Sequence, residues 1–401
     1  MNIKTPVNLS SEAFTNNKHA HFRYLLEEAP VHKAKVMTGL SVYAISRYED
    51  VDRFLKDKSL VRDRTSLGKS PFPFPLPKSV QLLASGMINK DDPEHQRLRR
   101  LVSGAFTPAA IKKLSQRIEV LADELVHSLK DKSTIDLRSD FAHPIPVAMI
   151  AEMVGIEKDE VPKLAQSMAS LTEGFSGLRI LKTIAFDLPA AVEFLRTLIA
   201  RKKQNPGNDI LTALIQAEDD EGALSDDELV AMVFVLIIAG HETTFNLITN
   251  AVHALLTHKE QLKRLQEDAG LMPSAIEEVL RHSGPIYGTK GEYSRVDLEL
   301  HGVRIPKGKM IMNLVGAANL DPSVFKEPER FDIARDNNRH FGFGVGPHFC
   351  LGASLARLET KVALSRLFEH FPNLSLQDPS NLVLNNRPGW HEFKALPVNL
   401  R

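Results

Sequence analysis

Apolar residues recur at helical spacing along most of this chain. Side chains three and four positions apart share one face of a helix, so this pattern indicates helices packed on a core. The segments predicted to be helical are Glu94–Phe106, Ile111–Leu129, Pro189–Lys203, Glu260–Gln266 and Pro273–Arg281. Helices therefore dominate the expected structure.

Alternating apolar and polar positions, typical of strands, occur in only two places. Val31–Val36 and Ser41–Ser46 flank a Thr38-Gly39 turn, and Asp297–Leu300 and Val303–Ile305 flank His301-Gly302. Both patterns predict β-hairpins. No flexible linker divides the chain, so we expect one domain over residues 1–401 of the mostly α, α+β class.

The longest apolar run, Leu229–Gly240, follows the capping-box sequence Ser225-Asp226-Asp227-Glu228. The helical pattern continues to about His258, a length of about 50 Å at ~1.5 Å per residue. The apolar run is shorter than the roughly 20 residues of a membrane span. The N-terminal Met1–Ala20 is polar, so we predict a core helix and no membrane association.

The middle of this helix reads Ala239-Gly240-His241-Glu242-Thr243-Thr244. Glycine and β-branched residues weaken a helix, and a threonine hydroxyl can bond the carbonyl four residues back, here that of Ala239. We therefore expect a local interruption. Its proximity to Glu242 indicates either a site for a small ligand and protons or a kink with a glutamate paired in the core.

Composition excludes several classes of protein. The 401 residues carry 50 basic and 50 acidic side chains, so no long-range field favours nucleic acid. A single cysteine allows neither an intrachain disulfide nor a cysteine-only metal site. A reducing, cytoplasmic location fits this composition best.

That cysteine, Cys350, lies in the glycine-rich segment 343–352, directly before a predicted helix at Ala353–Leu367. The N-terminus of a helix stabilises a thiolate. Gly344 and Gly346 allow the loop to turn amide N–H groups toward the sulfur. Most lone cysteines are inert core residues, but this loop favours a metal-binding thiolate.

With these segments, the sequence resembles the cytochrome P450 family in its soluble bacterial branch. The haem-binding signature is matched at Phe343, Gly346, His348, Cys350 and Gly352. The other matching motifs are, in the family's order, Asp92-Pro93-Glu94-His95 with Arg99, then Ala239-Gly240 with Glu242-Thr243, then Glu278-x-x-Arg281, then Pro328-Glu329-Arg330-Phe331.

The resemblance implies the P450 fold, a large helical domain with small antiparallel sheets and a long helix over haem. It implies haem b (iron protoporphyrin IX) with Cys350 as iron ligand. Glu242 and Thr243 are the implied catalytic pair. The implied haem-binding residues are His95, Arg99, Ala239, Gly240, Phe343, Gly346, His348, Cys350 and Gly352. Glu278, Arg281 and Arg330 form an implied structural ion-pair cluster. His95 has an alternative role in capping its helix.

The implied activity is that of a monooxygenase, which inserts one oxygen atom of O2 into a C–H bond or epoxidises the substrate. The two electrons would come from NAD(P)H through a separate ferredoxin or flavodoxin with its reductase, and the enzyme would be a monomer. The alternatives are a peroxide-driven peroxygenase and a non-catalytic haem-binding sensor. The Glu242-Thr243 pair argues against both of these alternatives.

By position, ten residues would line the substrate pocket, each with ordinary core packing as its alternative. They are Phe72, Phe74, Leu82, Phe175, Leu178, Leu236, Ala239, Ile286, Tyr287 and Trp390. Two of them lie in the proline-rich stretch Pro71–Pro77, which cannot be helical and forms either a linker or a wall over the pocket. An apolar substrate follows, such as a polyketide or macrolide, terpenoid, steroid or fatty acid.

One position departs from the family pattern. Similar sequences carry an arginine for a haem propionate where this chain has Glu292, with Lys290 and Arg295 nearby. An acidic side chain beside a haem propionate is unfavourable because the two negative charges repel each other. Either a neighbouring cation replaces the arginine or the 288–294 loop is shifted.

Overall fold

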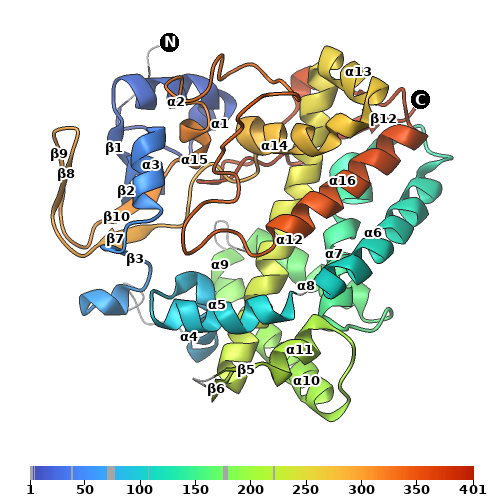
Figure 1. Cartoon of the computed structure of the whole chain (residues 1–401), viewed down its shortest axis with the longest axis horizontal. Helices are drawn as coiled ribbons and strands as arrows, with labels where there is room; N and C mark the ends of the chain where they lie inside the picture. Colours follow the sequence, from blue (N-terminus) through green and yellow to red (C-terminus); the bar gives the residue numbers. More distant parts are fainter. Residues whose placement is uncertain are drawn as a thin grey trace. The chain divides into compact units, whose positions relative to one another are not determined.

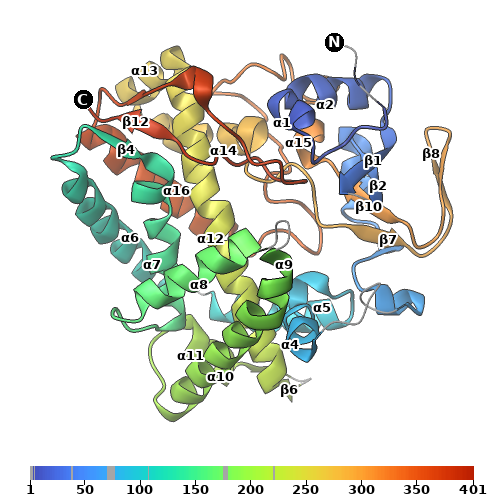
Figure 2. The same cartoon turned by 180° about the vertical axis from the view of Figure 1, so that it is seen from behind.

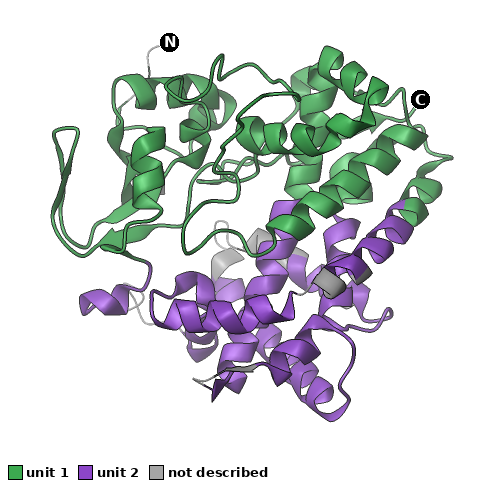
Figure 3. Cartoon of the chain, in the orientation of Figure 1, with its two compact units in different colours: residues 1–61, 123–142, 245–401 green, residues 62–122, 143–244 purple. Residues whose placement is uncertain are grey.

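The structure is a computed structural model that describes residue 3 and residues 5–37, 39–69, 77–106, 108–174, 179–219 and 222–401. Figures 1 and 2 show its helices and short strands along the chain. The chain forms two compact units, and Figure 3 colours them separately. Unit 1 comprises residues 1–61, 123–142 and 245–401, and unit 2 comprises residues 62–122 and 143–244. The single domain over residues 1–401 stays a prediction.

Unit 1 contains a five-stranded sheet in the order β1-β2-β10-β7-β3. Its strands are β1 (Val31–Met37), β2 (Leu40–Ile45), β3 (Leu60–Val61), β7 (Glu292–Ser294) and β10 (Met310–Asn313). Strands β1 and β2 pair antiparallel from Val31 opposite Ile45. Gly39 turns the chain between them with a φ of 78°, which a residue with a Cβ rarely adopts. The first predicted hairpin is confirmed.

The second predicted hairpin is also confirmed, as β8 (Leu298–Leu300) and β9 (Val303–Ile305). His301 and Gly302 turn it with positive φ values of 49° and 72°. A further sheet in unit 1 has the order β11-β12-β4, formed by β4 (Thr134–Asp136), β11 (Ser375–Leu376) and β12 (Pro397–Asn399).

The helices of unit 1 are α1 (Glu12–Asn16), α2 (Lys18–Glu27), α3 (Tyr48–Phe54), α13 (Lys259–Glu267), α14 (Met272–Ser283), α15 (Val315–Ala318) and α16 (Ala353–His370), with short helical turns at Arg138–Ala142, Ala269–Leu271 and Pro379–Asn381. Unit 1 contains two apolar core clusters, to which α1, α2, α3 and α15 of its helices contribute. Helices α2 and α15 pack side by side in Figure 1. Phe14, Phe22 and Tyr287 form one core, with ring centroids 5.5 to 5.8 Å apart.

Unit 2 is almost entirely helical. Its helices are α4 (Lys78–Leu83), α5 (Glu94–Ala105), α7 (Pro144–Val154), α8 (Val161–Gly174), α9 (Arg179–Lys182), α10 (Leu188–Gln204) and α11 (Ile210–Gln216), with turns at Arg64–Leu67, Met87–Asn89 and Thr183–Asp187. A small hairpin joins β5 (Glu218–Asp219) to β6 (Gly222–Ala223). Two helices, α6 (Pro108–Leu129) and α12 (Asp226–Thr257), cross from one unit to the other.

Every helix predicted from the apolar spacing is present, with ends within three residues of those expected. Helix α12 ends one residue before His258. Its capping box is confirmed, because the Ser225 N–H donates to Glu228 Oε2 at 2.8 Å and the Glu228 N–H donates to Ser225 Oγ at 3.3 Å.

The expected interruption of α12 is wrong. The helix is continuous from Asp226 to Thr257. The Thr243 hydroxyl does donate to the Ala239 carbonyl, at 2.6 Å, but this hydrogen bond leaves the helix unbroken. Of the described helices, α12 is long and apolar enough to span a membrane, but 61% of its most apolar window is buried inside the protein. That burial is typical of a core helix.

Candidate haem site

Cys350 ends a tight loop that closes on itself directly before α16. Its N–H donates to the Phe343 carbonyl at 2.9 Å, and the Phe349 N–H donates to the Gly346 carbonyl at 3.1 Å. Gly344 and Gly346 have φ values of 66° and 75°. A Cβ on Gly346 would lie 2.6 Å from the Leu55 carbonyl, so only glycine fits there. The loop therefore holds a partly exposed thiol near the N-terminus of α16.

A set of charged residues that the sequence analysis missed braces this loop. The Arg357 guanidinium lies 4.5 Å from the centroid of the Phe343 ring and makes two hydrogen bonds, of 2.6 and 2.7 Å, to the Glu277 carboxylate. His340 adds a contact of 3.1 Å to Glu277. Burial alone would raise the pKa of Glu277, but these hydrogen bonds outweigh burial and lower that pKa to about 2.

The position of Glu277, directly before the Glu278-x-x-Arg281 motif, could have signalled this brace. Arg357 also interacts electrostatically with Cys350, although its hydrogen bonds to Glu277 are the main reason that its pKa is raised. Positive charge therefore lies within reach of the thiol, which favours the thiolate.

The predicted ion-pair cluster is present with a different third member. Arg281 makes two hydrogen bonds of 2.8 Å to Glu278, and both side chains have an exposed fraction of 0%. The arginine that completes the cluster is Arg335, whose Nε lies 3.1 Å from Glu278 Oε2.

The assignment of Arg330 to this cluster is therefore wrong. Its side chain is 56% exposed and pairs with Glu327 at 3.3 Å. Arg330 contributes its backbone carbonyl instead, which accepts hydrogen bonds from Arg281 and Arg335. Sequence spacing could not distinguish two arginines five residues apart on one irregular segment, because only the path of the loop decides which side chain points inward.

Unit 2 contains the predicted acid and alcohol on α12. The Glu242 side chain is buried, and Thr243, the next residue, is half-buried with its hydroxyl on the Ala239 carbonyl. Gly240 faces Ile150, where an added Cβ would make ordinary contact at 3.6 Å. His241 is buried as well, and its ring lies 4.6 Å from that of His143.

Helix α5 carries His95 and Arg99 one turn apart, as predicted. His95 is buried, its Nδ1 lies 3.4 Å from Asp92 Oδ1, and burial lowers its pKa even though Asp92 opposes this change. The start of α5 has no side-chain capping hydrogen bond, so nothing there supports the alternative capping role of His95. Arg97, between them in the sequence, forms an ion pair with Glu228 of the α12 capping box.

The predicted substrate-pocket residues occupy varied positions. Phe72, Phe74, Phe175 and Leu178 lie outside the described residues. Leu82 and Leu236 are half-buried and Ala239 is exposed. Ile286 forms a β-bridge with Trp390, whose ring is 4.0 Å from the Arg387 guanidinium. Tyr287 is buried in the core with Phe14 and Phe22, which agrees with the core-packing alternative, and its place in the substrate pocket stays a prediction.

Glu292 lies in β7, buried, where Asn313 donates a hydrogen bond of 3.2 Å to its Oε2. Its neighbours in β7 pair in register with β3 and β10. The strand is thus regular at this position. The side-chain amide of Asn313 supplies one hydrogen bond to the buried Glu292 carboxylate.

Comparison with known proteins identifies the class. A family model described as cytochrome P450 matches residues 188–388. Cytochrome P450 107B1 of Saccharopolyspora erythraea is 39% identical over 91% of this chain and 90% of its own length. The chain therefore belongs to the cytochrome P450 family, and it is a monooxygenase that uses haem and O2. The family and fold predicted from the sequence are confirmed.

Two solved structures are closely similar. The Bacillus subtilis bacillaene polyketide synthase cytochrome P450 PksS has a TM-score of 0.91 and 32% identity, with 98% of this chain and 99% of that chain covered. P450BioI, solved in complex with an acyl carrier protein ligated to hexadec-9Z-enoic acid, has a TM-score of 0.88 and 32% identity, with 97% and 100% covered.

The residues described above fit haem b. A cysteine near the N-terminus of a helix, in a closed loop and in electrostatic contact with Arg357, matches a thiolate ligand of haem iron. His95, Arg99 and His348 are hydrogen-bond donors of the kind that haem carboxylates need. The chemistry of these donors agrees with the cofactor that the family implies.

Proposed function

We propose that Cys350 ligates haem iron as a thiolate, and that His95, Arg99 and His348 hold the haem propionates. With thiolate ligation, haem iron supplies the activation of O2 for insertion into a C–H bond. The closed Cys350 loop and the Arg357–Glu277 brace support this assignment, because they hold the thiol in one position and keep positive charge near it. Phe343, Gly346 and Gly352 maintain the loop.

We further propose that Thr243 and Glu242 deliver protons. The Thr243 hydroxyl donates its proton to the Ala239 carbonyl, so its oxygen can accept a hydrogen bond from a water molecule. Glu242 directly precedes Thr243 in α12, and its buried carboxyl group can carry a proton. This pair favours O2-dependent turnover over the peroxide-driven alternative.

For the substrate, we propose an apolar polyketide or fatty-acyl chain, which the enzyme hydroxylates or epoxidises. This proposal rests on the similarity over nearly the whole chain to PksS, a polyketide enzyme, and to P450BioI, which was solved with an acyl carrier protein that bears a fatty acid. The apolar candidates Leu82 and Leu236 of unit 2 agree with such a substrate. Terpenoids and steroids are the other classes to test.

We propose that electrons reach the enzyme from NAD(P)H through a ferredoxin or flavodoxin and its reductase, in the cytoplasm, with the enzyme as a monomer. The single cysteine supports a separate donor, because the chain has no cysteine set for an iron–sulfur cluster.

Spectral titration and reconstituted turnover test this proposal. Fatty acids, macrolactones, terpenes and steroids are titrated into the holoenzyme, and the shift to the high-spin Soret spectrum is measured. Hits are then turned over with a surrogate ferredoxin system, and product is counted per NADPH. We expect acyl or polyketide compounds to bind most tightly and to be oxidised. Turnover driven only by hydrogen peroxide would contradict the proposed electron route.

A further inference from the structure

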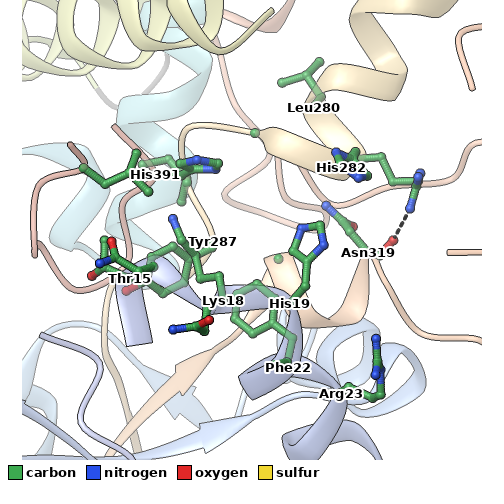
Figure 4. Close-up of a pocket in the computed structure, with 18 residues that line it drawn as sticks. Thr15, Lys18, His19, Phe22, Arg23, Leu280, His282, Tyr287, Asn319 and His391 are labelled. Carbon is green, nitrogen blue, oxygen red and sulfur yellow. Dashed lines mark hydrogen bonds between the residues drawn. The ribbon is translucent and has the colours of Figure 1, made fainter. Parts of the chain in front are cut away.

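Unit 1 contains a cavity of about 470 Å³ between helix α2 and the chain that follows α14. Its wall includes Lys18, His19, Phe22, Ile286, Tyr287 and His391. Figure 4 shows the labelled basic and aromatic side chains gathered around it. No residue of the Cys350 loop lines this cavity, and none of the residues proposed to hold haem belongs to its wall. The cavity therefore needs an explanation of its own.

Lys18 is the unusual residue of this wall. Only 8% of it is exposed, and its Nζ has no hydrogen-bond partner in the part of the chain that the structure describes. The ammonium group lies over the ring of Tyr287, whose centroid is 5.3 Å away. Burial lowers the pKa of Lys18 to about 7, although Glu392 opposes this change. A buried ammonium group without a partner is costly, so the site favours an incoming anion.

The other titratable groups around the cavity make it basic. The ring of His19 lies 5.1 Å from that of His282, and His391 interacts electrostatically with Lys18, His19, His253 and His282. Burial is the main reason that the pKa values of these histidines are lowered. Lys18 and the three histidines of the wall, His19, His282 and His391, thus lose charge mainly through desolvation, and an anion would reverse that loss.

The acids and arginines nearby already have partners. Glu329 pairs with Arg23. Glu392 accepts a hydrogen bond from Asn246 at 3.3 Å and lies 3.8 Å from Arg387. Arg281 is held by Glu278. No described carboxylate forms a hydrogen bond with Lys18 Nζ.

We propose that this cavity binds a small organic carboxylate, with its carboxylate against Lys18 and its apolar part on Phe22, Ile286 and Tyr287. The aromatic and aliphatic wall gives the preference for an organic anion over inorganic phosphate. The carboxylate recharges Lys18, so binding takes up a proton from solution at pH values above the lowered pKa. This inference is independent of the proposed substrate and redox partner.

Calorimetry of the holoenzyme with benzoate tests the proposal, with benzamide as the neutral analogue and inorganic phosphate as the second anion. We expect benzoate to bind at least tenfold more tightly than either. At pH 8, the binding heat should change with the ionisation enthalpy of the buffer, because about one proton is taken up. The Soret spectrum should not change, which separates this site from binding beside haem.

Lys18→Met should weaken benzoate binding at least tenfold and remove the buffer dependence, while Lys18→Arg should retain binding. Lys33→Met, at an exposed lysine on β1 of the same unit, is the matched control and should bind as the parent does. Circular dichroism and haem content check that each variant folds. Equal binding by Lys18→Met, equal binding of benzamide, or absence of benzoate binding to the parent would overturn the proposal.

Discussion

The Arg335 guanidinium lies 3.1 Å from the Glu278 carboxylate inside the protein, whereas Arg330, five residues earlier, pairs with Glu327 at the surface. Glu278 also accepts hydrogen bonds from the Asp332 N–H and the Asn338 amide. One buried carboxylate thus holds the segment after Pro328 against α14. The side chain of Arg335 is needed for this contact, and that of Arg330 is not.

Arg335→Ala is therefore expected to destabilise the holoenzyme by about 2–4 kcal/mol, because it leaves a buried carboxylate with fewer donors. Arg330→Ala should cost at most about 0.5 kcal/mol, as for an exposed ion pair, since its carbonyl stays in place. Urea unfolding and the rate of haem transfer to apomyoglobin measure both effects. Equal losses for the two variants would contradict the assignment.

Cys350→Ser should abolish the far-red-shifted Soret band of the reduced carbon monoxide adduct, because a hydroxyl cannot replace thiolate as a strong electron donor. The difference spectrum of the reduced protein measures this band directly. The control is Ser354→Ala, at an exposed position in the first turn of α16. A retained band in Cys350→Ser would refute the ligand assignment.

Thr243→Ala should keep oxygen consumption but divert it toward hydrogen peroxide, with product per NADPH falling about tenfold or more. The reason is that the hydroxyl on the Ala239 carbonyl would no longer position water. Thr257→Ala is the matched control, since its hydroxyl makes the same kind of bond, to the His253 carbonyl at 2.8 Å, in the last turn of α12. Unchanged coupling in Thr243→Ala would show that another group positions the water.

Glu277 links stability to pH. Its pKa is about 2 in the folded protein, below the ordinary value of 4.5, because hydrogen bonds from Arg357 and His340 outweigh burial. It therefore contributes stability above about pH 4.5, and that contribution is lost as the pH falls toward 2. Thermal unfolding of the parent and of Glu277→Gln, measured from pH 6 downward, should differ most near pH 6 and converge in acid. A constant difference would contradict this linkage.

Glu292→Arg should leave haem affinity equal or higher, since arginine is the usual residue where this chain has an acid. The control, Glu299→Arg, changes an exposed position of β8 by the same charge. Haem titration of the apoprotein measures both. A marked loss confined to Glu292→Arg would show that the alignment of the 288–294 loop is wrong.

The sequence by itself determined the helices with clear apolar spacing, the two hairpins and the class of cofactor. These features are local. Apolar spacing specifies a helix face, Gly39 and Gly302 specify turns, and the glycines before Cys350 permit the positive φ values of its loop. The family motifs then identified the enzyme without any tertiary contact.

Only the tertiary structure decided which side chains meet across the chain. These contacts join residues far apart in sequence. They are the ion pair of Arg335 with Glu278, the hydrogen bonds of Arg357 to Glu277, and the packing of Tyr287 in the N-terminal core. The same holds for Lys18, whose position beside Tyr287 depends on α2 packing near the chain after α14. Such pairings depend on the paths of irregular loops, which spacing along one segment does not specify.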